Sequence, residues 1–103
     1  MVKTEFSQSV REYIYKRDEE RCVYCGTIHF LGVAHIFVSR AKGGKGVKEN
    51  GVLLCQRHHH DLDNGRDAEK AQRIEDYCKR YLEQKEGIID IDALTIKNKW
   101  VRD

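Results

Sequence analysis

Two widely separated pairs of residues could together bind a metal ion. Cys22 and Cys25 form a Cys-x2-Cys pair, and Cys55 and His58, separated from the first pair by 29 residues, form a Cys-x2-His pair. A two-residue gap allows a tight turn to direct both side chains of a pair toward one ion, and two such pairs supply the ligands of a tetrahedral structural zinc site. We therefore predict a structural zinc ion bound by Cys22, Cys25, Cys55 and His58.

Other uses of these cysteines and histidines fit the pattern less well. A redox role for Cys22 and Cys25 would leave Cys55 and His58 without a purpose, and the sequence lacks the βαβ pattern expected around a redox motif. Two more histidines follow His58, but only His58 has the two-residue spacing from Cys55. Cys78 has apolar neighbours at helical spacing, so we expect it to be a buried core residue.

Three further residues could carry out hydrolysis. His35 lies in an apolar segment, Asn50 precedes a second apolar run, and His59 directly follows the last predicted zinc ligand. Phosphodiester hydrolysis needs an activated water, and a neutral histidine titrates in the right range to accept its proton. It also needs a counter-charge for the phosphate, which a divalent cation supplies. A lone histidine in a strand is usually a core residue, but the ordered set beside two zinc-binding pairs favours a reactive site.

These residues, taken in order, resemble the HNH nuclease family. The resemblance covers about residues 17–65 and rests on the segments RCVYCG, VAHIFVSRAKGGKG and ENGVLLCQRHHHDLDNG. It is strongest to phage and bacterial HNH proteins that carry a zinc knuckle. It implies a ββα-metal fold and a metal-dependent DNA endonuclease that hydrolyses phosphodiester bonds.

The resemblance also implies roles for individual residues. His35 is the expected general base, and His59 is the expected ligand of a catalytic divalent cation. Asp63 follows His59 by four residues, on the same face of a helix, and could share that cation. Mg²⁺, Mn²⁺ or another divalent cation suits such a site better than a second zinc ion if a carboxylate and waters complete the shell. Asn50 is expected to orient the loop through side-chain to backbone hydrogen bonds.

One position departs from the family pattern. HNH proteins frequently carry Asp or His directly before the general base, as a metal ligand, but this sequence has Ala34 there. Asp63, Asp61 or His60 could compensate, water could fill the position, or the cation could bind weakly. The departure bears on the strength of the activity more than on the fold.

Hydrophobic periodicity predicts the elements that position these residues. They are a helix over 7–18, a strand over 31–38, a basic loop over 39–50, a return strand at 52–54, a helix over 56–64 and a helix over about 67–85. The helix over 56–64 is predicted to end at Asn64 and Gly65. The expected class is α+β: one domain over residues 1–103, with a ββα-metal core (a β-hairpin plus a helix), a structural zinc and flanking helices.

The excess of positive charge is concentrated in one part of the chain. The whole sequence has a net charge of only +2, but residues 22–55 hold four basic residues against Glu49 alone. The basic residues are Arg40, Lys42, Lys45 and Lys48. Because they lie close to His35 and Asn50 in the sequence, we expect them to contact phosphates of double-stranded DNA without reading its bases.

The sequence shows neither a membrane-spanning segment nor a secretory signal. No apolar run approaches the roughly 18–20 residues that cross a bilayer, and the first residues lack a secretory signal. We therefore expect a cytoplasmic protein of a bacterium or phage-infected cell, with no membrane partner. One active site cuts one strand, so a double-strand break would require a homodimer, two sequential nicks or a partner protein.

Two other functions fit parts of the same sequence. Ala34 and the modest net charge would suit a non-catalytic, zinc-stabilised module that binds nucleic acid or protein. The zinc-binding pairs alone would suit a structural domain of a larger complex, for instance a phage packaging assembly.

Overall fold

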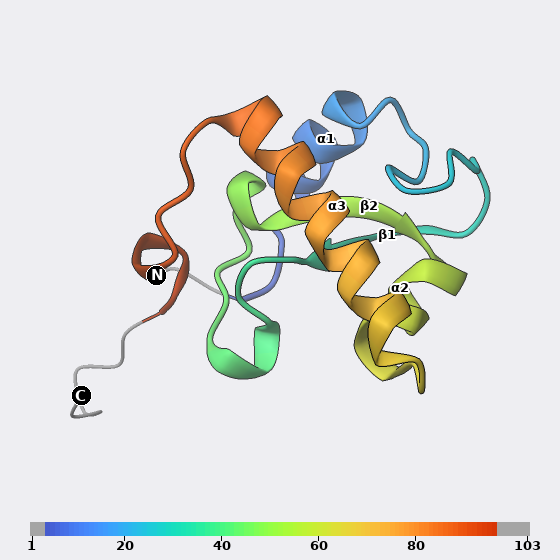
Figure 1. The fold of residues 1–103 in the computed structure, drawn as a ribbon. Helices are drawn as coiled ribbons and strands as arrows, with labels where there is room; N and C mark the ends of the chain where they lie inside the picture. Colours follow the sequence, from blue (N-terminus) through green and yellow to red (C-terminus); the bar gives the residue numbers. More distant parts are fainter. Residues whose placement is uncertain (1–3, 97–103) are drawn as a thin grey trace.

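Residues 4–96, the part of the chain that the structure describes, fold into three helices around a two-stranded hairpin, as the expected α+β class requires. The computed structural model describes residues 4–96 of the 103-residue chain. Its elements, in chain order, are α1 (Gln8–Arg17), β1 (Leu31–His35), β2 (Gly51–Cys55), α2 (Gln56–Asn64) and α3 (Ala68–Glu86), with short 3-10 turns at η1 (Arg40–Lys42), η2 (Lys48–Asn50) and η3 (Asp92–Leu94) (Figure 1). The predicted fold class is confirmed.

The hairpin is antiparallel and short. Its register runs from Leu31 opposite Cys55 to His35 opposite Gly51. The first strand was expected to reach Val38 but ends at His35. The backbone N–H groups of Phe37 and Val38 donate instead to the side chain of Asn50, so they are not free to extend the strand pairing.

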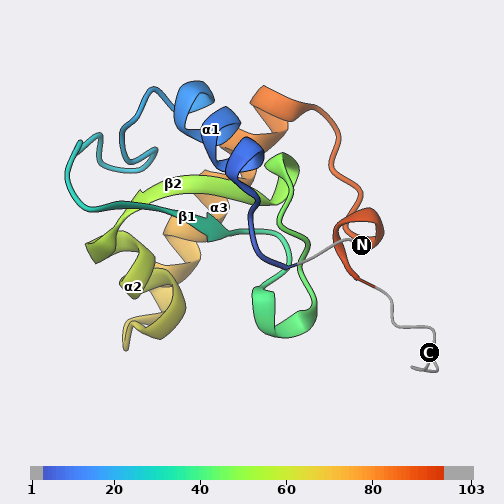
Figure 2. The same cartoon turned by 180° about the vertical axis from the view of Figure 1, so that it is seen from behind.

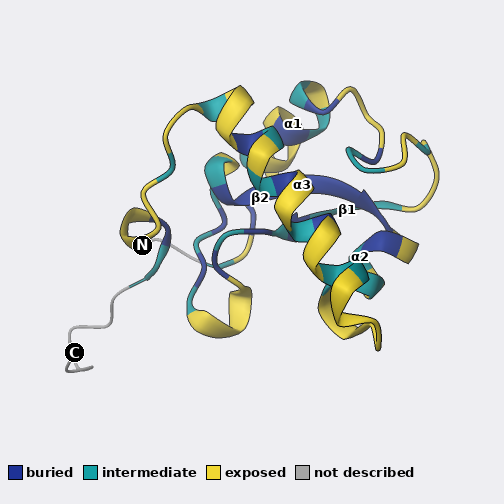
Figure 3. Cartoon of the chain, viewed as in Figure 1, coloured by how far each residue is buried: buried dark blue, intermediate teal, exposed yellow. Residues whose placement is uncertain are grey.

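Strand β2 is buried along its whole length because helices cover both faces of the hairpin (Figures 1 and 2). Val52 and Leu54 pack with Ile74 of α3, whereas Leu53 points to the opposite face and packs with Ile14 of α1. This alternation follows from the two-residue period of a strand. Figure 3 shows the consequence, a buried β2 between helices whose outer faces are exposed.

Side chains and one glycine define the helix ends. Ser7 caps α1 by accepting a hydrogen bond from the Val10 N–H at 3.3 Å. Helix α2 ends at Asn64, as predicted, but Gly65 does not adopt the left-handed conformation, since its φ is −67°. A Cβ at Gly65 would lie 2.4 Å from the Asp61 carbonyl oxygen, so close approach of the backbone is what requires glycine there.

No helix among residues 4–96 is long and apolar enough to span a membrane.

Candidate functional site

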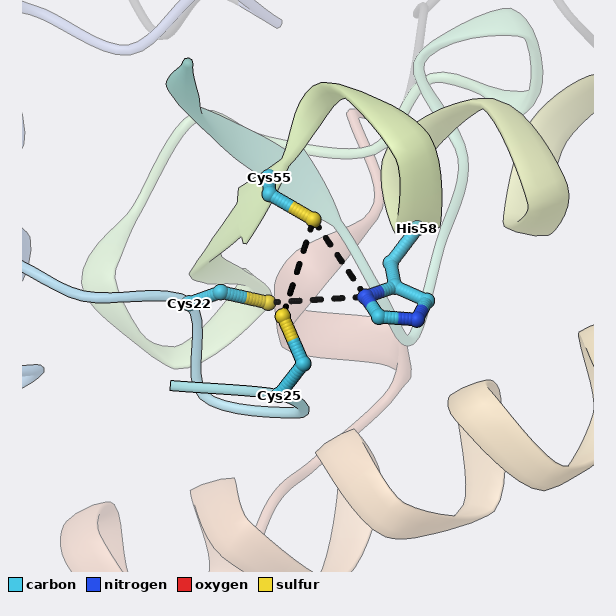
Figure 4. A group of neighbouring side chains, drawn as sticks. All are labelled: Cys22, Cys25, Cys55 and His58. Carbon is cyan, nitrogen blue, oxygen red and sulfur yellow. Dashed lines mark hydrogen bonds between the residues drawn. The ribbon is translucent and has the colours of Figure 1, made fainter. Parts of the chain in front are cut away.

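The Cys/His pairs predicted from spacing meet at one point in the structure. Cys22, Cys25, Cys55 and His58 place their donor atoms within 4.8 Å of one another (Figure 4). The Cys55 Sγ and His58 Nδ1 are 3.3 Å apart, and the Cys22 Sγ to His58 Nδ1 and Cys25 Sγ to Cys55 Sγ distances are both 3.8 Å. Ligands of one tetrahedral zinc ion, at ordinary Zn–S and Zn–N lengths, are separated by about 3.5–3.8 Å. The donor set and its spacing fit zinc, so this cluster could hold a zinc ion.

The chain segment that carries Cys22 and Cys25 is a closed turn. The Cys22 N–H donates to the Thr27 carbonyl, and the Gly26 N–H donates to the Cys22 carbonyl, both at 2.8 Å. Gly26 has a φ of 80°, the left-handed conformation expected of a glycine in such a turn. The Val23 N–H donates to the Leu53 carbonyl and so attaches the turn to β2. The cysteine pair is therefore held against the hairpin by backbone hydrogen bonds.

The fourth cysteine is separate from this cluster. Cys78 lies on α3 and is fully buried in the core with Ile74 and Leu82. Burial raises the pKa of its thiol to about 12, so it stays protonated and chemically inert. The prediction that Cys78 is a core residue is confirmed.

His35 is half-buried at the end of β1, where its ring is fixed by two contacts. Its Nε2 lies 2.7 Å from the Thr4 carbonyl oxygen, and its ring packs against Phe6 with centroids 4.5 Å apart. A carbonyl can only accept, so Nε2 carries the proton and donates, which leaves Nδ1 as the acceptor nitrogen. Burial lowers the pKa of His35, although the hydrogen bond to Thr4 acts in the opposite direction. His35 is therefore a neutral imidazole near pH 7.

Asn50 is fully buried and makes four hydrogen bonds across the loop between the strands. Its Oδ1 accepts from the N–H groups of Phe37 and Val38 at 2.8 and 3.0 Å. Its Nδ2 donates to the carbonyl oxygens of Val38 and Lys45 at 2.9 and 3.1 Å. Both ends of the loop are thus attached to one side chain, directly after the strand that carries His35.

His59 and Asp63 are brought together on α2. The His59 Nε2 lies 3.0 Å from Asp63 Oδ2, and both side chains are partly open to solvent. Helix α2, which carries both residues, packs against β1, which ends at His35. The charge of Asp63 raises the pKa of His35 and that of His59 lowers it. The structure therefore places a nitrogen and oxygen donor pair on the helix that packs against the strand of His35.

The position before His35 is closed to a ligand. Ala34 is 1% exposed and packs in the core with Val52 and Leu54. Of the residues considered as substitutes, Asp61 is paired with Lys70 at 3.1 Å, whereas His60 is exposed and lines a hollow with His59 and Asp63.

The four residues of the basic loop do not point to one place. Arg40 forms an exposed ion pair with Glu5 at 3.2 Å, and its charge lowers the pKa of His35. Lys48 is directed away from the hairpin toward Glu86 of α3, at 3.5 Å. Lys45 lines a separate hollow with residues of the C-terminal segment, and Lys42 is exposed on η1.

A buried ion pair at the end of α1 was not expected from the sequence. Arg17 binds both carboxylate oxygens of Asp18, at 2.7 and 3.1 Å, and also reaches Glu86 at 3.2 Å. Asp18 in turn accepts from the Leu53 N–H at 2.9 Å and from the Tyr81 hydroxyl at 2.6 Å. The pair joins α1, β2 and α3. Its signal was present in the sequence, because Arg17 falls on the apolar face of its helix, where a charged residue needs a partner.

Comparison with known proteins finds similarity among solved structures. No protein-family model matches the sequence, and no curated protein matches it. Among solved structures, the Type IV phosphorothioation-dependent restriction endonuclease ScoMcrA is similar, with a TM-score of 0.57 and 26% sequence identity. The match covers 78% of this chain and 20% of that chain, so the present chain spans about a fifth of the endonuclease.

The similarity and the metal-ligand cluster together indicate a nuclease-like or nucleic-acid-related protein. Neither the similarity nor the structure supports a homodimer or a phage packaging partner.

Proposed function

We propose that the chain is a metal-dependent DNA endonuclease of the HNH type. The observation that supports this best is that the His59 and Asp63 pair lies on the helix that packs against the strand of His35, directly after a residue of the cluster that could hold structural zinc. A general base beside a cation site is the minimum that phosphodiester hydrolysis needs. The likeness in fold to a restriction endonuclease supports the same reaction class.

In this proposal His35 accepts the proton of the attacking water. The hydrogen bond from Nε2 to the Thr4 carbonyl fixes the tautomer, so Nδ1 is the nitrogen that receives the proton. The same bond stabilises the imidazolium that forms, since a carbonyl oxygen is a good acceptor for a charged donor. Phe6 limits rotation of the ring by packing against it.

His59 and Asp63 are the residues that would hold the catalytic cation. Their mixed nitrogen and oxygen donors, with room for waters, suit Mg²⁺ or Mn²⁺ better than a second zinc ion. A cation bound there supplies the counter-charge for the phosphate and polarises the leaving oxygen. Because Ala34 contributes no ligand, we expect weak cation binding and a requirement for millimolar metal.

Asn50 acts as a positioning residue. It holds the segment that follows His35 through bonds to Phe37 and Val38, and these bonds end β1 at His35. The orientation of the His35 side chain relative to α2 therefore depends on Asn50.

The proposed substrate is double-stranded DNA, contacted mainly through its phosphates, with one strand cut at each site. Arg40 is the basic residue of the loop whose charge lowers the pKa of His35, so it is the first candidate for a phosphate contact. Lys42, Lys45 and Lys48 would contribute to a broader and more diffuse attraction.

A supercoiled-plasmid assay with Mg²⁺ or Mn²⁺ tests the proposal. Wild type should convert supercoiled to nicked plasmid, and His35→Ala and His59→Ala should each lose most of that activity. Gln84→Ala, on an exposed part of α3, is the matched control and should cleave as wild type. Equal nicking by wild type and His35→Ala under every metal would contradict the proposal.

The burial of Ala34 favours one competing function, a nucleic-acid-binding module without catalysis. That function predicts DNA binding by both wild type and His35→Ala, with no cleavage by wild type. The plasmid assay combined with a binding measurement separates the two.

A further inference from the structure

The loop that connects the zinc-binding turn to β1 exposes large apolar side chains. Phe30 is 80% exposed and Ile28 is 64% exposed. Neither side chain belongs to the hydrophobic clusters of the core, so neither contributes to core packing.

The backbone at Phe30 is also unfavourable for its residue type. Its φ is 54°, in the left-handed region that a bulky residue seldom adopts. The Phe30 carbonyl accepts a hydrogen bond from the Gln56 N–H at 2.8 Å, and this bond fixes the loop against the start of α2. A glycine would make the same bond without strain. An exposed phenylalanine in a conformation that favours glycine is more readily explained by a role in binding than by a role in the core.

Phe30 borders a pocket of about 610 Å³ at the start of α2. It is lined by Phe30, Gln56, Arg57 and His60 and by three members of the metal-ligand cluster. A smaller hollow, which shares Phe30 and Gln56 with this pocket, leads to His59. The pocket therefore adjoins a hollow that is lined by His59, the residue expected to bind the catalytic cation.

The charge and hydrogen-bonding groups of the pocket suit a nucleic acid. Asp61 is the acidic residue in the wall, and Lys70 neutralises it at 3.1 Å. Arg57 remains exposed at the rim, where it can pair with a phosphate. The Gln56 carboxamide can donate to and accept from the edge of a base, and an exposed aromatic ring offers a stacking surface.

We propose that this pocket binds one unstacked nucleobase next to the cleaved phosphate. The base would stack on Phe30, with the Gln56 side chain at its edge and Arg57 on the adjoining phosphate. This assignment rests on the proposed function, because the pocket matters for cleavage only if the neighbouring site acts on DNA. Stacking of a base on an aromatic side chain is tolerant of sequence, so the pocket would add affinity more than specificity.

Binding of a short single-stranded oligonucleotide tests the inference without reading cleavage. The zinc-loaded His35→Ala protein is used at low salt, without added Mg²⁺ or Mn²⁺, and binding is followed by fluorescence anisotropy. Phe30→Gly should weaken binding about 5- to 150-fold, the range measured when stacking residues are replaced. Phe30→Leu should lose most of the same affinity because it keeps apolar area but not the ring. Ile88→Gly removes a fully exposed apolar side chain at a distant position and should bind normally.

Two further measurements show whether the effect comes from stacking. An oligonucleotide with abasic sites should bind less tightly than the intact one to the parent protein, but equally to Phe30→Gly. Thermal melting of Phe30→Gly should be unchanged or raised, which excludes a folding defect. The same measurements with the ribo-oligonucleotide show whether the base must belong to DNA.

Equal binding by Phe30→Gly and its parent, or no preference of the parent for intact over abasic DNA, would overturn the inference. These outcomes are separate from failure of the proposed function. If the wild type never cleaves but its binding depends on Phe30, the nuclease proposal fails and the base pocket is supported. If the wild type cleaves but its binding does not depend on Phe30, the base pocket fails and the nuclease proposal is supported.

Discussion

Replacing Asn50 by aspartate would change its hydrogen bonding with almost no change in shape. In the native protein Nδ2 donates to the carbonyl oxygens of Val38 and Lys45. In Asn50→Asp a carboxylate oxygen would face those two carbonyls, and because Asn50 is 0% exposed, water cannot reach them. Each buried carbonyl left without a donor costs about 1–3 kcal/mol, so we expect a loss of about 2–6 kcal/mol. That is a large share of the roughly 5–15 kcal/mol that stabilises a typical domain.

Urea unfolding followed by circular dichroism, in buffer with zinc, measures this loss. Asn64→Asp makes the same chemical change at an exposed position at the end of α2 and should shift stability by less than about 0.5 kcal/mol. An Asn50→Asp protein whose unfolding free energy falls by no more than that of Asn64→Asp would refute the reasoning. It would mean that the loop is not held by the Asn50 amide.

Three other outcomes follow from the structure. Arg17→Met should lower the free energy of unfolding in urea by about 3–5 kcal/mol because it leaves Asp18 buried without its cation. Arg40→Met, which breaks only an exposed ion pair, should lower it by less than about 1 kcal/mol. Equal losses in the two variants would contradict the buried network. Removal of zinc by a strong chelator, or Cys25→Ala, should abolish the cooperative thermal transition, and a retained transition after verified zinc loss would disprove the structural site. Burial lowers the pKa of His35, so its neutral form persists as the pH falls. The nicking rate at saturating metal should therefore stay constant from pH 8 to about 6.5 and decline only below that. A decline that begins near pH 8 would show that another group limits the rate.

The parts of the structure that could be predicted are those set by local spacing. The two-residue gaps selected Cys22, Cys25, Cys55 and His58, and the structure brings those four together. The four-residue interval between His59 and Asp63 placed them on one helical face, where they lie in contact. Both results depend on geometry within one turn or one helix, which sequence specifies directly.

The parts that could not be predicted depend on contacts between distant segments. The tautomer of His35 is set by the Thr4 carbonyl, which lies 31 positions away in the chain. The end of β1 is set by the Asn50 side chain, because it competes for the backbone N–H groups that a longer strand would use. Phe30 adopts a positive φ that propensity assigns to glycine, so its exposure is visible only in the folded chain.

The measurement that tests the central claim most directly is the ratio of nicking rates of wild type and His35→Ala on supercoiled plasmid. Both proteins are zinc-loaded, shown to be folded by the same thermal transition, and assayed at saturating Mn²⁺. General-base catalysis contributes about 10²- to 10⁴-fold, so wild type should nick faster by that factor. A ratio near one, with both proteins folded, would contradict the assignment of His35 as the general base and of the chain as an endonuclease.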